Sequence, residues 1–457
     1  MAGFDVVILG GGSGGYACAL RAAQLGMTVA LIEKDKLGGA CLHRGCIPTK
    51  ALLHTAELAD QARESPSFGI RTTFDGIDVA GVNVYKGSVV AKLYKGLSGL
   101  VRSRGITYVE GEGRLVDPTT VAVGETRYTG RHVVLATGST PKSLPGLELD
   151  GTRVISSDHA LELDRVPASA VILGGGVIGV EFASVWRSFG AEVTIVEALP
   201  HLVPAEDEAS STLLERAFRK RGIAFQVGAR FSTMEHTENG VRVLLETGEP
   251  LEAELLLLAV GRGPVSAGLG YEEAGVAMDR SFVPVDDYCQ TNVPTISAVG
   301  DLIPTPQLAH VGFGEGILVA ERLAGMDVAP IDYAGVPRVA YCEPEVASVG
   351  LTEAAAAQRY DANGIETLTY DLAGNGKSQI LKTTGAVKLV RRKDGPVVGV
   401  HLVGSRVGEL LAEAQLIYNW EALPAEVAQL IHAHPTQSEA LGEAHLALAG
   451  KPLHAHG

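Results

Sequence analysis

The sequence predicts an α/β protein in which one βαβ unit occurs twice and is followed by a domain of the α+β type. The segment beginning at Asp5 aligns without a gap to the segment beginning at Ser169. Each copy has the pattern of an apolar strand, a glycine-rich turn, a helix and a second strand that ends in glutamate. Further strand patterns, RVAYC, GAVKLV and VVGVHLVG, follow near the C-terminus. A length of 457 residues suits about three domains.

Both glycine turns have the spacing Gly-x-Gly-x-x-Gly, which is typical of dinucleotide-binding units. The first glycine allows the tight turn, the second lets the backbone approach a pyrophosphate at the helix N-terminus, and the third lets the helix pack close to the strand. The terminal acids Glu33 and Glu197 suit hydrogen bonds from ribose hydroxyls. The glycines are Gly10, Gly12 and Gly15 in the first unit and Gly174, Gly176 and Gly179 in the second. Two Rossmann-like domains are therefore expected.

The second unit is predicted to prefer NAD to NADP. A 2′-phosphate needs a nearby cation, but Glu197 is followed by Ala-Leu-Pro-His without Arg or Lys. The carboxylate of Glu197 would itself repel the phosphate. His201 is the only nearby candidate cation, and histidine is mostly neutral at pH 7.

Composition narrows the class of partners and the compartment. A formal charge of −15 argues against nucleic acid or an anionic membrane as the main partner. The five cysteines are too few and too scattered for a secreted disulfide scaffold. The N-terminus has no basic start, and no run of about 18 apolar residues exists, so neither a signal peptide nor a membrane span is expected. A cytoplasmic protein is predicted, with Cys18, Cys289 and Cys342 as inert buried residues.

Cys41 and Cys46 lie close together in the segment GGACLHRGCIPTK, shortly after Glu33. They could be apolar fillers, metal ligands or a redox pair, although zinc would need further ligands and none has the expected spacing. Positions i and i+5 of a straight helix are roughly 8 to 9 Å apart. A disulfide needs a Cα separation below about 7 Å. If the two cysteines bond, the helix must be distorted or only beginning; Gly45 permits this, and Pro48 suits a first helical turn.

The segment GGACLHRGCIPTK is similar to the redox segment of the pyridine nucleotide–disulfide oxidoreductases, and the match is nearest to their dihydrolipoamide dehydrogenases of actinobacterial type. The resemblance covers essentially the whole chain. It includes the second glycine motif and the segments ATGS, TNVPTISAVGD and IHAHPTQSE. It implies FAD at the first site and NAD at the second. The chain departs from the family pattern at His43, Arg44 and Thr49, which could alter the electrostatics of the disulfide but remove no catalytic atom.

The resemblance assigns roles to the residues around the disulfide. It implies that Cys41 exchanges with the substrate thiol and that Cys46 faces the flavin and forms a charge-transfer complex with it. Lys50 resembles the lysine beside the flavin that pairs with a glutamate, here Glu181.

The resemblance also assigns residues that bind the cofactors. Asp301 is expected to hold the FAD ribitol and Glu33 the FAD ribose, while Gly261 lies on the nicotinamide side. The further positions expected at the cofactors are Gly113, against the adenine, and Thr137, Gly138 and Ser139 of the ATGS segment.

The segment IHAHPTQSE supplies a candidate base, which dithiol oxidation needs to take up the substrate proton. By resemblance the base is His434 and its orienting carboxylate is Glu439, whereas His432 is structural. The family uses its C-terminal domain as a dimer interface, and its histidine serves the disulfide of the other subunit. The stretch AEAQLIYNWEALPAEVAQLIHAH is apolar at helical spacing, which suits such an interface and equally suits a core helix.

Four segments are expected: residues 1–148 bind FAD and carry the disulfide, 149–262 bind NAD, 263–336 complete the FAD site, and 337–457 form the dimerisation domain. The predicted reaction is NAD-dependent oxidation of dihydrolipoamide. The predicted partners are a second copy of the chain and a separate lipoyl-bearing protein, either the acyltransferase of a 2-oxoacid dehydrogenase complex or the lipoyl carrier of glycine cleavage. The alternatives are another flavin disulfide reductase, of glutathione or mycothione type, and a non-catalytic flavoprotein subunit.

Overall fold

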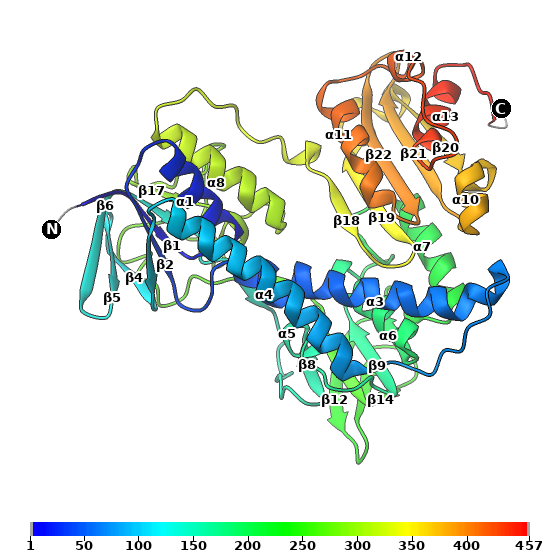
Figure 1. The fold of residues 1–457 in the computed structure, drawn as a ribbon, viewed down its shortest axis with the longest axis horizontal. Coiled ribbons are helices and arrows are strands. Elements are labelled where there is room, and N and C mark those ends of the chain that lie inside the picture. The colour runs from blue at the N-terminus through cyan, green and yellow to red at the C-terminus, as the bar shows by residue number, and fades with distance from the viewer. Residues whose placement is uncertain (1–2, 455–457) are drawn as a thin grey trace.

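A computed structural model describes residues 3–454 and places the two glycine motifs in two separate sheets (Figure 1). The first sheet has the strand order β3-β2-β1-β6-β5-β4, and β17 pairs with β6. The strands β1, β2, β3, β6 and β17 run parallel, whereas β4 and β5 form an antiparallel extension with β6. The strands are β1 (Phe4–Leu9), β2 (Val29–Glu33), β3 (Thr107–Glu110), β4 (Gly113–Asp117), β5 (Thr120–Val123), β6 (Thr126–Leu135) and β17 (Ile296–Ala298).

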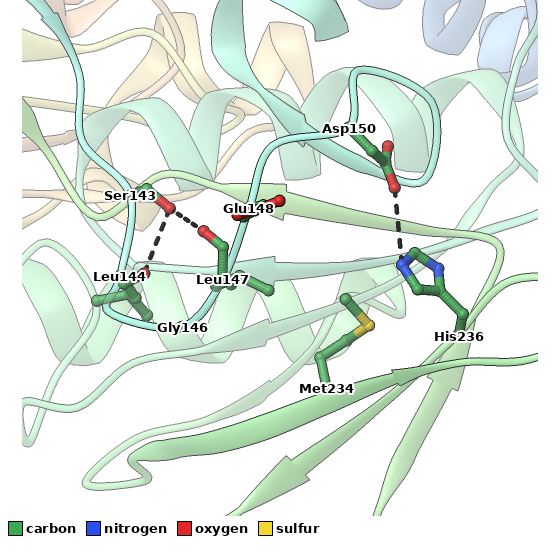
Figure 2. Close-up of a pocket in the computed structure, with 8 residues that line it drawn as sticks. All are labelled: Ser143, Leu144, Gly146, Leu147, Glu148, Asp150, Met234 and His236. Atoms are coloured by element: carbon green, nitrogen blue, oxygen red, sulfur yellow. Dashed lines mark hydrogen bonds and ion pairs between the residues drawn. The ribbon is translucent and has the colours of Figure 1, made fainter.

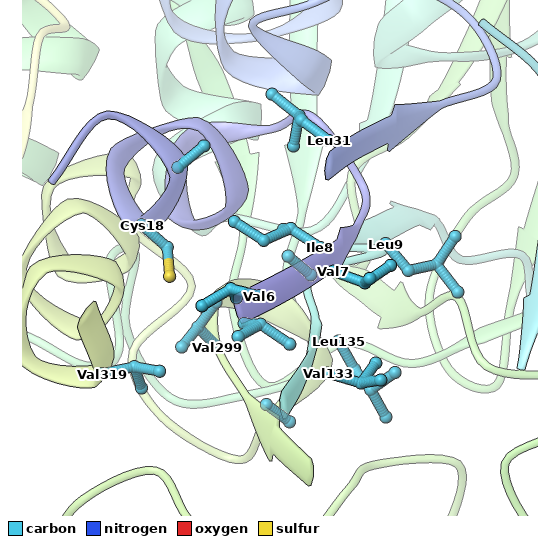
Figure 3. Close-up of a cluster of buried hydrophobic side chains, with 14 of the residues drawn as sticks. Val6, Val7, Ile8, Leu9, Cys18, Leu31, Val133, Leu135, Val299 and Val319 are labelled. Carbon is cyan, nitrogen blue, oxygen red and sulfur yellow. The ribbon is translucent and has the colours of Figure 1, made fainter. Parts of the chain in front are cut away.

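The core of the first unit lies between this sheet and the helices α1 (Ser13–Gln24) and α8 (Ala309–Leu323). Figure 3 shows Val6 and Ile8 of β1 packed near Val299, with Cys18 of α1 facing them. These side chains are almost completely buried. Strands that are apolar on both faces belong inside a parallel sheet covered by helices, as the continuous run VVIL predicts. Because β17 and α8 come from the predicted segment 263–336, that segment completes the first unit in space.

A helical excursion separates β2 from β3. It consists of α2 (Gly39–Arg44), α3 (Cys46–Glu64), the short 3₁₀ helix η1 (Ser65–Phe68) and α4 (Val79–Ser103). The helix α4 packs against α1, α2 and α3. The excursion therefore holds the cysteine segment next to the first glycine turn.

The second unit repeats the first on a sheet of order β11-β10-β9-β15-β8. The strands are β8 (Val154–Ser156), β9 (Ser169–Leu173), β10 (Glu192–Val196), β11 (Ala224–Gln226) and β15 (Leu255–Leu258), with helices α5 (Ser157–Ala160), α6 (Val177–Phe189) and α7 (Glu208–Arg221). A smaller antiparallel sheet contains β12 (Phe231–His236), β13 (Val241–Leu245) and β14 (Leu251–Ala253). The two units are joined by an antiparallel pair, β7 (Ser139–Pro141) with β16 (Arg262–Pro264).

The C-terminal domain is a five-stranded antiparallel sheet of order β18-β19-β22-β21-β20, which lies above α3 in Figure 1. Its strands are β18 (Arg338–Ala340), β19 (Glu345–Gly350), β20 (Ile365–Asp371), β21 (Ala386–Arg392) and β22 (Val397–Gly404). Its helices are α9 (Glu353–Tyr360), α10 (Gly376–Leu381), α11 (Leu411–Asn419), α12 (Pro424–Val427) and α13 (Glu439–Leu448). Short 3₁₀ helices are η2 (Gly300–Leu302), η3 (Tyr333–Gly335), η4 (Ala362–Gly364), η5 (Leu372–Gly374) and η6 (Val407–Leu410). The predicted α+β class is confirmed.

Among residues 3–454, no helix combines the length and the apolar character that crossing a membrane requires.

Candidate active site

A cavity of about 1320 Å³ runs between the two units and reaches the C-terminal domain. Ligand pockets for drug-sized molecules have volumes of roughly 300–1,000 Å³, so this space is large enough for more than one small ligand. Its wall contains both cysteines of the redox segment, residues of both glycine turns, and Tyr341 from the C-terminal domain. The predicted residues that line it are Gly12, Glu33, Cys41, Cys46, Lys50, Thr137, Gly138, Ser139, Gly174, Gly176, Glu181, Glu197, Gly261 and Asp301.

The glycine turns match their predicted roles. Gly10 has φ +110° and Gly174 has φ +106°, a backbone region that favours glycine. A Cβ atom at Gly15 would lie 1.8 Å from the carbonyl oxygen of Gly10, so only glycine allows this close approach of helix to strand. Gly179 is in the same situation, with 1.9 Å to the oxygen of Gly174. These two glycines lie behind the cavity wall and serve packing.

The middle glycines differ from their neighbours, because they face the open cavity. A Cβ atom at Gly12 would meet nothing closer than 3.9 Å, and one at Gly176 would meet nothing within 4 Å. The space beyond them lies at the N-terminal ends of α1 and α6, where backbone N–H groups favour an anion. The room left by these two glycines suits a pyrophosphate.

Each terminal glutamate is fixed by backbone N–H groups. Glu33 accepts hydrogen bonds from the N–H of Gly11 at 2.7 Å and of Asp35 at 2.8 Å. Glu197 accepts the equivalent bonds from Gly175 at 2.6 Å and Leu199 at 2.8 Å. The repeat therefore extends to side-chain contacts, and both carboxylates are held at the cavity wall.

The redox segment is broken between its two cysteines, as the spacing requires for a bonded pair. Helix α2 ends at Arg44, Gly45 has φ −146° and ψ −113°, and Cys46 is the first residue of α3. Pro48 lies in the first turn of α3, where its missing N–H costs nothing. Both cysteines are free thiols in this structure.

The two thiols are electrostatically different. The hydrogen bond between them raises the pKa of Cys41 and lowers that of Cys46 to about 7, against the effect of burial. Lys50 lowers the pKa of Cys46 further. Cys46 is therefore the more acidic of the two thiols. By contrast, burial raises the pKa of Cys18 to about 12, which agrees with its prediction as an inert residue.

Lys50 and Glu181 form an ion pair across the two units. The Nζ atom of Lys50 lies 2.9 Å from both carboxylate oxygens of Glu181. Burial lowers the pKa of Lys50, but Glu181, Cys46 and Tyr341 together raise it overall. Glu181 also accepts a hydrogen bond from the N–H of Tyr341 at 2.9 Å, and the ring of Tyr341 lies 4.8 Å from Nζ. The pair is thereby held beside Cys46.

A line of alternating charges, which the sequence did not reveal, follows the cavity wall. Arg44 lies 3.0 Å from Asp35 and 3.8 Å from Asp158. Arg262 lies 3.9 Å from Asp158 and donates to the Oγ of Ser139 at 2.8 Å, and Ser139 donates to Asp301. No local sequence pattern predicts these contacts, because folding brings the residues together from different segments of the chain.

A buried carboxylate, Glu315, lies behind Asp301 and was not predicted from the sequence. It accepts hydrogen bonds from the N–H of Gly300 at 2.6 Å and from Thr305 at 2.7 Å. Burial raises its pKa to about 7. Glu315 therefore fixes the backbone turn that presents Asp301.

The candidate base lies outside the cavity lining. The Nδ1 atom of His434 is 2.7 Å from Glu439, and the imidazole is 76% exposed. Glu439 also accepts from the N–H of Thr436 at 2.8 Å. The predicted pair is thus formed, but this chain does not place it with its own cysteines. His432 bonds to Glu413 at 2.8 Å and is largely buried, as its structural role predicts.

Gly113, which was predicted to lie against the adenine, is packed closely within the protein. A Cβ atom there would meet Leu9 at 2.5 Å and Ile32 at 3.0 Å. The glycine is buried and does not line the cavity. The close packing alone explains why this position is glycine, without any contact to a ligand.

A smaller hollow of about 490 Å³ lies beside the linker between the units (Figure 2). His236 of β12 lies 3.9 Å from Asp150 across it. Leu144 borders both this hollow and the large cavity. The hollow carries none of the predicted residues.

Large apolar side chains are exposed near the C-terminus. Ile431 is 100% exposed, Trp420 76% and Leu430 59%. Exposed apolar groups at this density mark an interface rather than a core helix. Of the two readings that the sequence left open for this stretch, the interface is the one that the structure favours.

Comparison with known proteins gives a consistent result over nearly the whole chain. Residues 4–316 match the family "Pyridine nucleotide-disulphide oxidoreductase", and residues 336–445 match its dimerisation domain. The chain is 41% identical to a dihydrolipoyl dehydrogenase of Bacillus subtilis, over 99% of each protein. It is 38% identical to the mitochondrial dihydrolipoyl dehydrogenase 1 of Arabidopsis thaliana, over 98% of this chain and 91% of that protein.

Solved structures agree. The crystal structure of LpdA from Mycobacterium tuberculosis has a TM-score of 0.90 at 27% identity and covers 97% of this chain and 99% of its own. The flavoprotein disulfide reductase RclA from Escherichia coli has a TM-score of 0.86 at 27% identity, over 96% of this chain and 99% of its own. The doubled glycine motif, the broken cysteine helix and these likenesses together show that the chain belongs to the pyridine nucleotide-disulphide oxidoreductase family.

Proposed function

We propose that the protein is a dihydrolipoyl dehydrogenase, which oxidises dihydrolipoamide to lipoamide and reduces NAD to NADH. The observation that carries the proposal is the thiol pair at a helix break inside a cavity shared by two dinucleotide units. The relatives that are 37–41% identical over nearly their full length and carry the name dihydrolipoyl dehydrogenase support the choice of substrate.

The residues present fit FAD in the first unit and NAD in the second. Gly12 and Gly176 leave room for a pyrophosphate at the start of each helix. Residues 1–148 with 263–336 would hold FAD, through Glu33, Asp301 and the ATGS segment, and residues 149–262 would hold NAD, through Glu197 and Gly261. FAD, when bound, supplies the two-electron chemistry that links the thiols to NAD. The carboxylate of Glu197, which would repel a 2′-phosphate, favours NAD over NADP.

The thiol chemistry follows from the unequal cysteines. With the cysteines oxidised to a disulfide, a substrate thiolate attacks Sγ of Cys41, the bond between Cys41 and Cys46 breaks, and Cys46 leaves as a thiolate. The low pKa of Cys46 makes it the better leaving group. The second substrate thiolate then attacks the substrate sulfur of the mixed disulfide and releases Cys41. Lipoamide is formed and both cysteines end reduced.

His434 is proposed as the base that takes the protons of the substrate thiols. Its Nδ1 is held by Glu439, which leaves Nε2 free for the proton. Because His434 is exposed and lies outside the cavity of its own chain, it would act on the disulfide of a second copy. The protein is thus proposed to work as a homodimer, and the matched dimerisation domain supports this.

The proposed partner is a separate lipoyl-bearing protein, either the acyltransferase of a 2-oxoacid dehydrogenase complex or the lipoyl carrier of glycine cleavage. The proposed location is the cytoplasm, where the thiols stay reducible.

A steady-state assay with free dihydrolipoamide and either NAD or NADP tests the proposal. Reduction of NAD, at a kcat/KM far above that for NADP, is expected. Turnover of glutathione disulfide with NADPH, in place of dihydrolipoamide oxidation, would instead identify another disulfide reductase. Flavin binding without turnover of any disulfide or dithiol would identify a non-catalytic subunit.

A further inference from the structure

The helix α4 carries an unusual charge distribution for a protein with a formal charge of −15. Residues 79–109 contain no Asp or Glu, whereas five of the chain's Lys and Arg residues lie there. One of them, Lys86, is buried and bonds to the carbonyl of Leu161. The other four are exposed and form no ion pair with any residue from 3 to 454: Lys92, Lys95, Arg102 and Arg104.

The exposed face of α4 is two-sided. Each residue of a helix is rotated by about 100° from the one before, which places Lys92, Lys95 and Arg102 along one edge of the exposed face. Leu93 and Leu100 follow the other edge and are 44% and 42% exposed. Surfaces that combine exposed apolar side chains with unpaired charge of one sign are typical of docking sites for oppositely charged partners.

This face is close to the redox segment. On the opposite side of α4, the ring of Tyr94 packs edge-on against His43 of α2, with ring centroids 5.3 Å apart. The helix α2 also carries Cys41. A helix is about 10–12 Å across, so a protein docked on α4 lies about one helix diameter from the helix of the substrate-facing cysteine.

We infer that the face formed by Lys92, Leu93, Lys95, Leu100, Arg102 and Arg104 docks an acidic protein domain that bears the lipoyl group. This inference rests on the proposed function. The cations attract and orient the acidic domain, while the leucines provide apolar contact once it has docked. A chain that is otherwise strongly acidic would repel such a domain from other directions, so the charge of α4 also selects the side of approach.

The test is a double variant, Lys92→Gln with Lys95→Gln, compared with Arg216→Gln with Lys220→Gln. Arg216 and Lys220 are exposed cations of α7 that also form no ion pair among the described residues and do not line the cavity. Each variant removes two positive charges from one helix. The substrates are free dihydrolipoamide, a reduced lipoyl domain of net negative charge, and the same domain with its surface carboxylates changed to amides.

The α4 variant is expected to raise KM for the acidic domain about three- to tenfold at low salt, because the loss of two exposed positive charges weakens the attraction to that domain. The difference should vanish near 1 M salt, where charges are screened beyond about 3 Å. Free dihydrolipoamide and the neutralised domain should show no change, and the α7 variant should behave like the unchanged protein.

Equal KM values for the two variants on the acidic domain would overturn the docking inference. A shift of the α4 variant to monomer in light scattering would assign the face to a second copy, and would overturn it too. Failure of the unchanged protein to oxidise free dihydrolipoamide would instead overturn the proposed function, so the two failures are distinguishable.

Discussion

Cys41 and Cys46 are chemically distinct because their surroundings differ, although both lie at the same helix break. Cys46 lies near the Lys50–Glu181 pair. Cys41 donates a hydrogen bond to the sulfur of Cys46. This difference supports the proposed roles, in which Cys41 exchanges with the substrate and Cys46 holds the negative charge.

Opposite changes at the ion pair should move the pKa of Cys46 in opposite directions. Lys50→Met removes a cation that favours the thiolate, so the pKa of Cys46 should rise above about 7. Glu181→Gln removes an anion that disfavours the thiolate, so this pKa should fall. Thiolate absorbance of the reduced proteins, recorded against pH, measures both. Shifts of the same sign would contradict the assigned electrostatics.

The base and its carboxylate should differ in importance. His434→Gln should lower kcat for dihydrolipoamide oxidation about 10²- to 10⁴-fold, the range for loss of a general base. Glu439→Gln keeps a hydrogen-bond acceptor for Nδ1, so its loss should be smaller. Because the hydrogen bond from Thr436 and His434 lower the pKa of Glu439 despite its partial burial, the carboxylate stays ionised above pH 5. The pH profile of kcat should therefore show the same ionisations between pH 5 and 8 in the unchanged protein and in Glu439→Gln. Loss of one of these ionisations in the variant would contradict the lowered pKa of Glu439.

At the scale of elements, substitution of the second and of the third glycine in the turn before α6 should have different effects on stability and on NAD binding. Gly179→Ala should destabilise the protein by about 1–3 kcal/mol or more, because the new Cβ would overlap the oxygen of Gly174. Gly176→Ala meets open space, so it should keep the melting temperature and raise KM for NAD. Thermal melting and NAD kinetics on the two variants check this. Equal melting temperatures would show that the close helix–strand contact is unimportant.

The sequence predicted the elements that local rules govern. The two glycine units and the helix break between Cys41 and Cys46 follow from glycine spacing and helix geometry, and the structure has them. It did not predict the line from Arg44 through Asp158 to Arg262, or the position of Glu315, because these contacts join segments far apart in the chain.

The apolar C-terminal stretch also differs from a single helix. It is divided into α11 and α12, because Glu421 adopts φ +53° and Pro424 begins the next helix. The apolar pattern alone does not contain the position of this break. It does include the apolar residues that the structure leaves exposed, such as Trp420 and Ile431.

At the scale of the whole molecule, the surface around Trp420 and Ile431 should be covered by a second copy. Ile431→Asp should shift the protein toward monomer, because a charge cannot be buried there unpaired. Light scattering measures the mass. A stable dimer with unchanged activity would place the interface elsewhere.

Mixed dimers test whether the base acts between chains. Cys41→Ser and His434→Gln proteins should each be inactive, whereas a hybrid of the two should regain activity, because one site then combines an intact Cys41 with an intact His434. An inactive hybrid would mean that each chain uses its own histidine.

The most direct test of the central claim is an anaerobic reduction of the purified flavoprotein by dihydrolipoamide, followed by addition of NAD or NADP. We predict long-wavelength absorbance from the Cys46 thiolate beside the flavin, which NAD discharges with formation of NADH and NADP does not. Discharge by NADP alone would contradict the role of Glu197. No spectral change on addition of dihydrolipoamide would contradict the assignment of the substrate and of the cysteine pair.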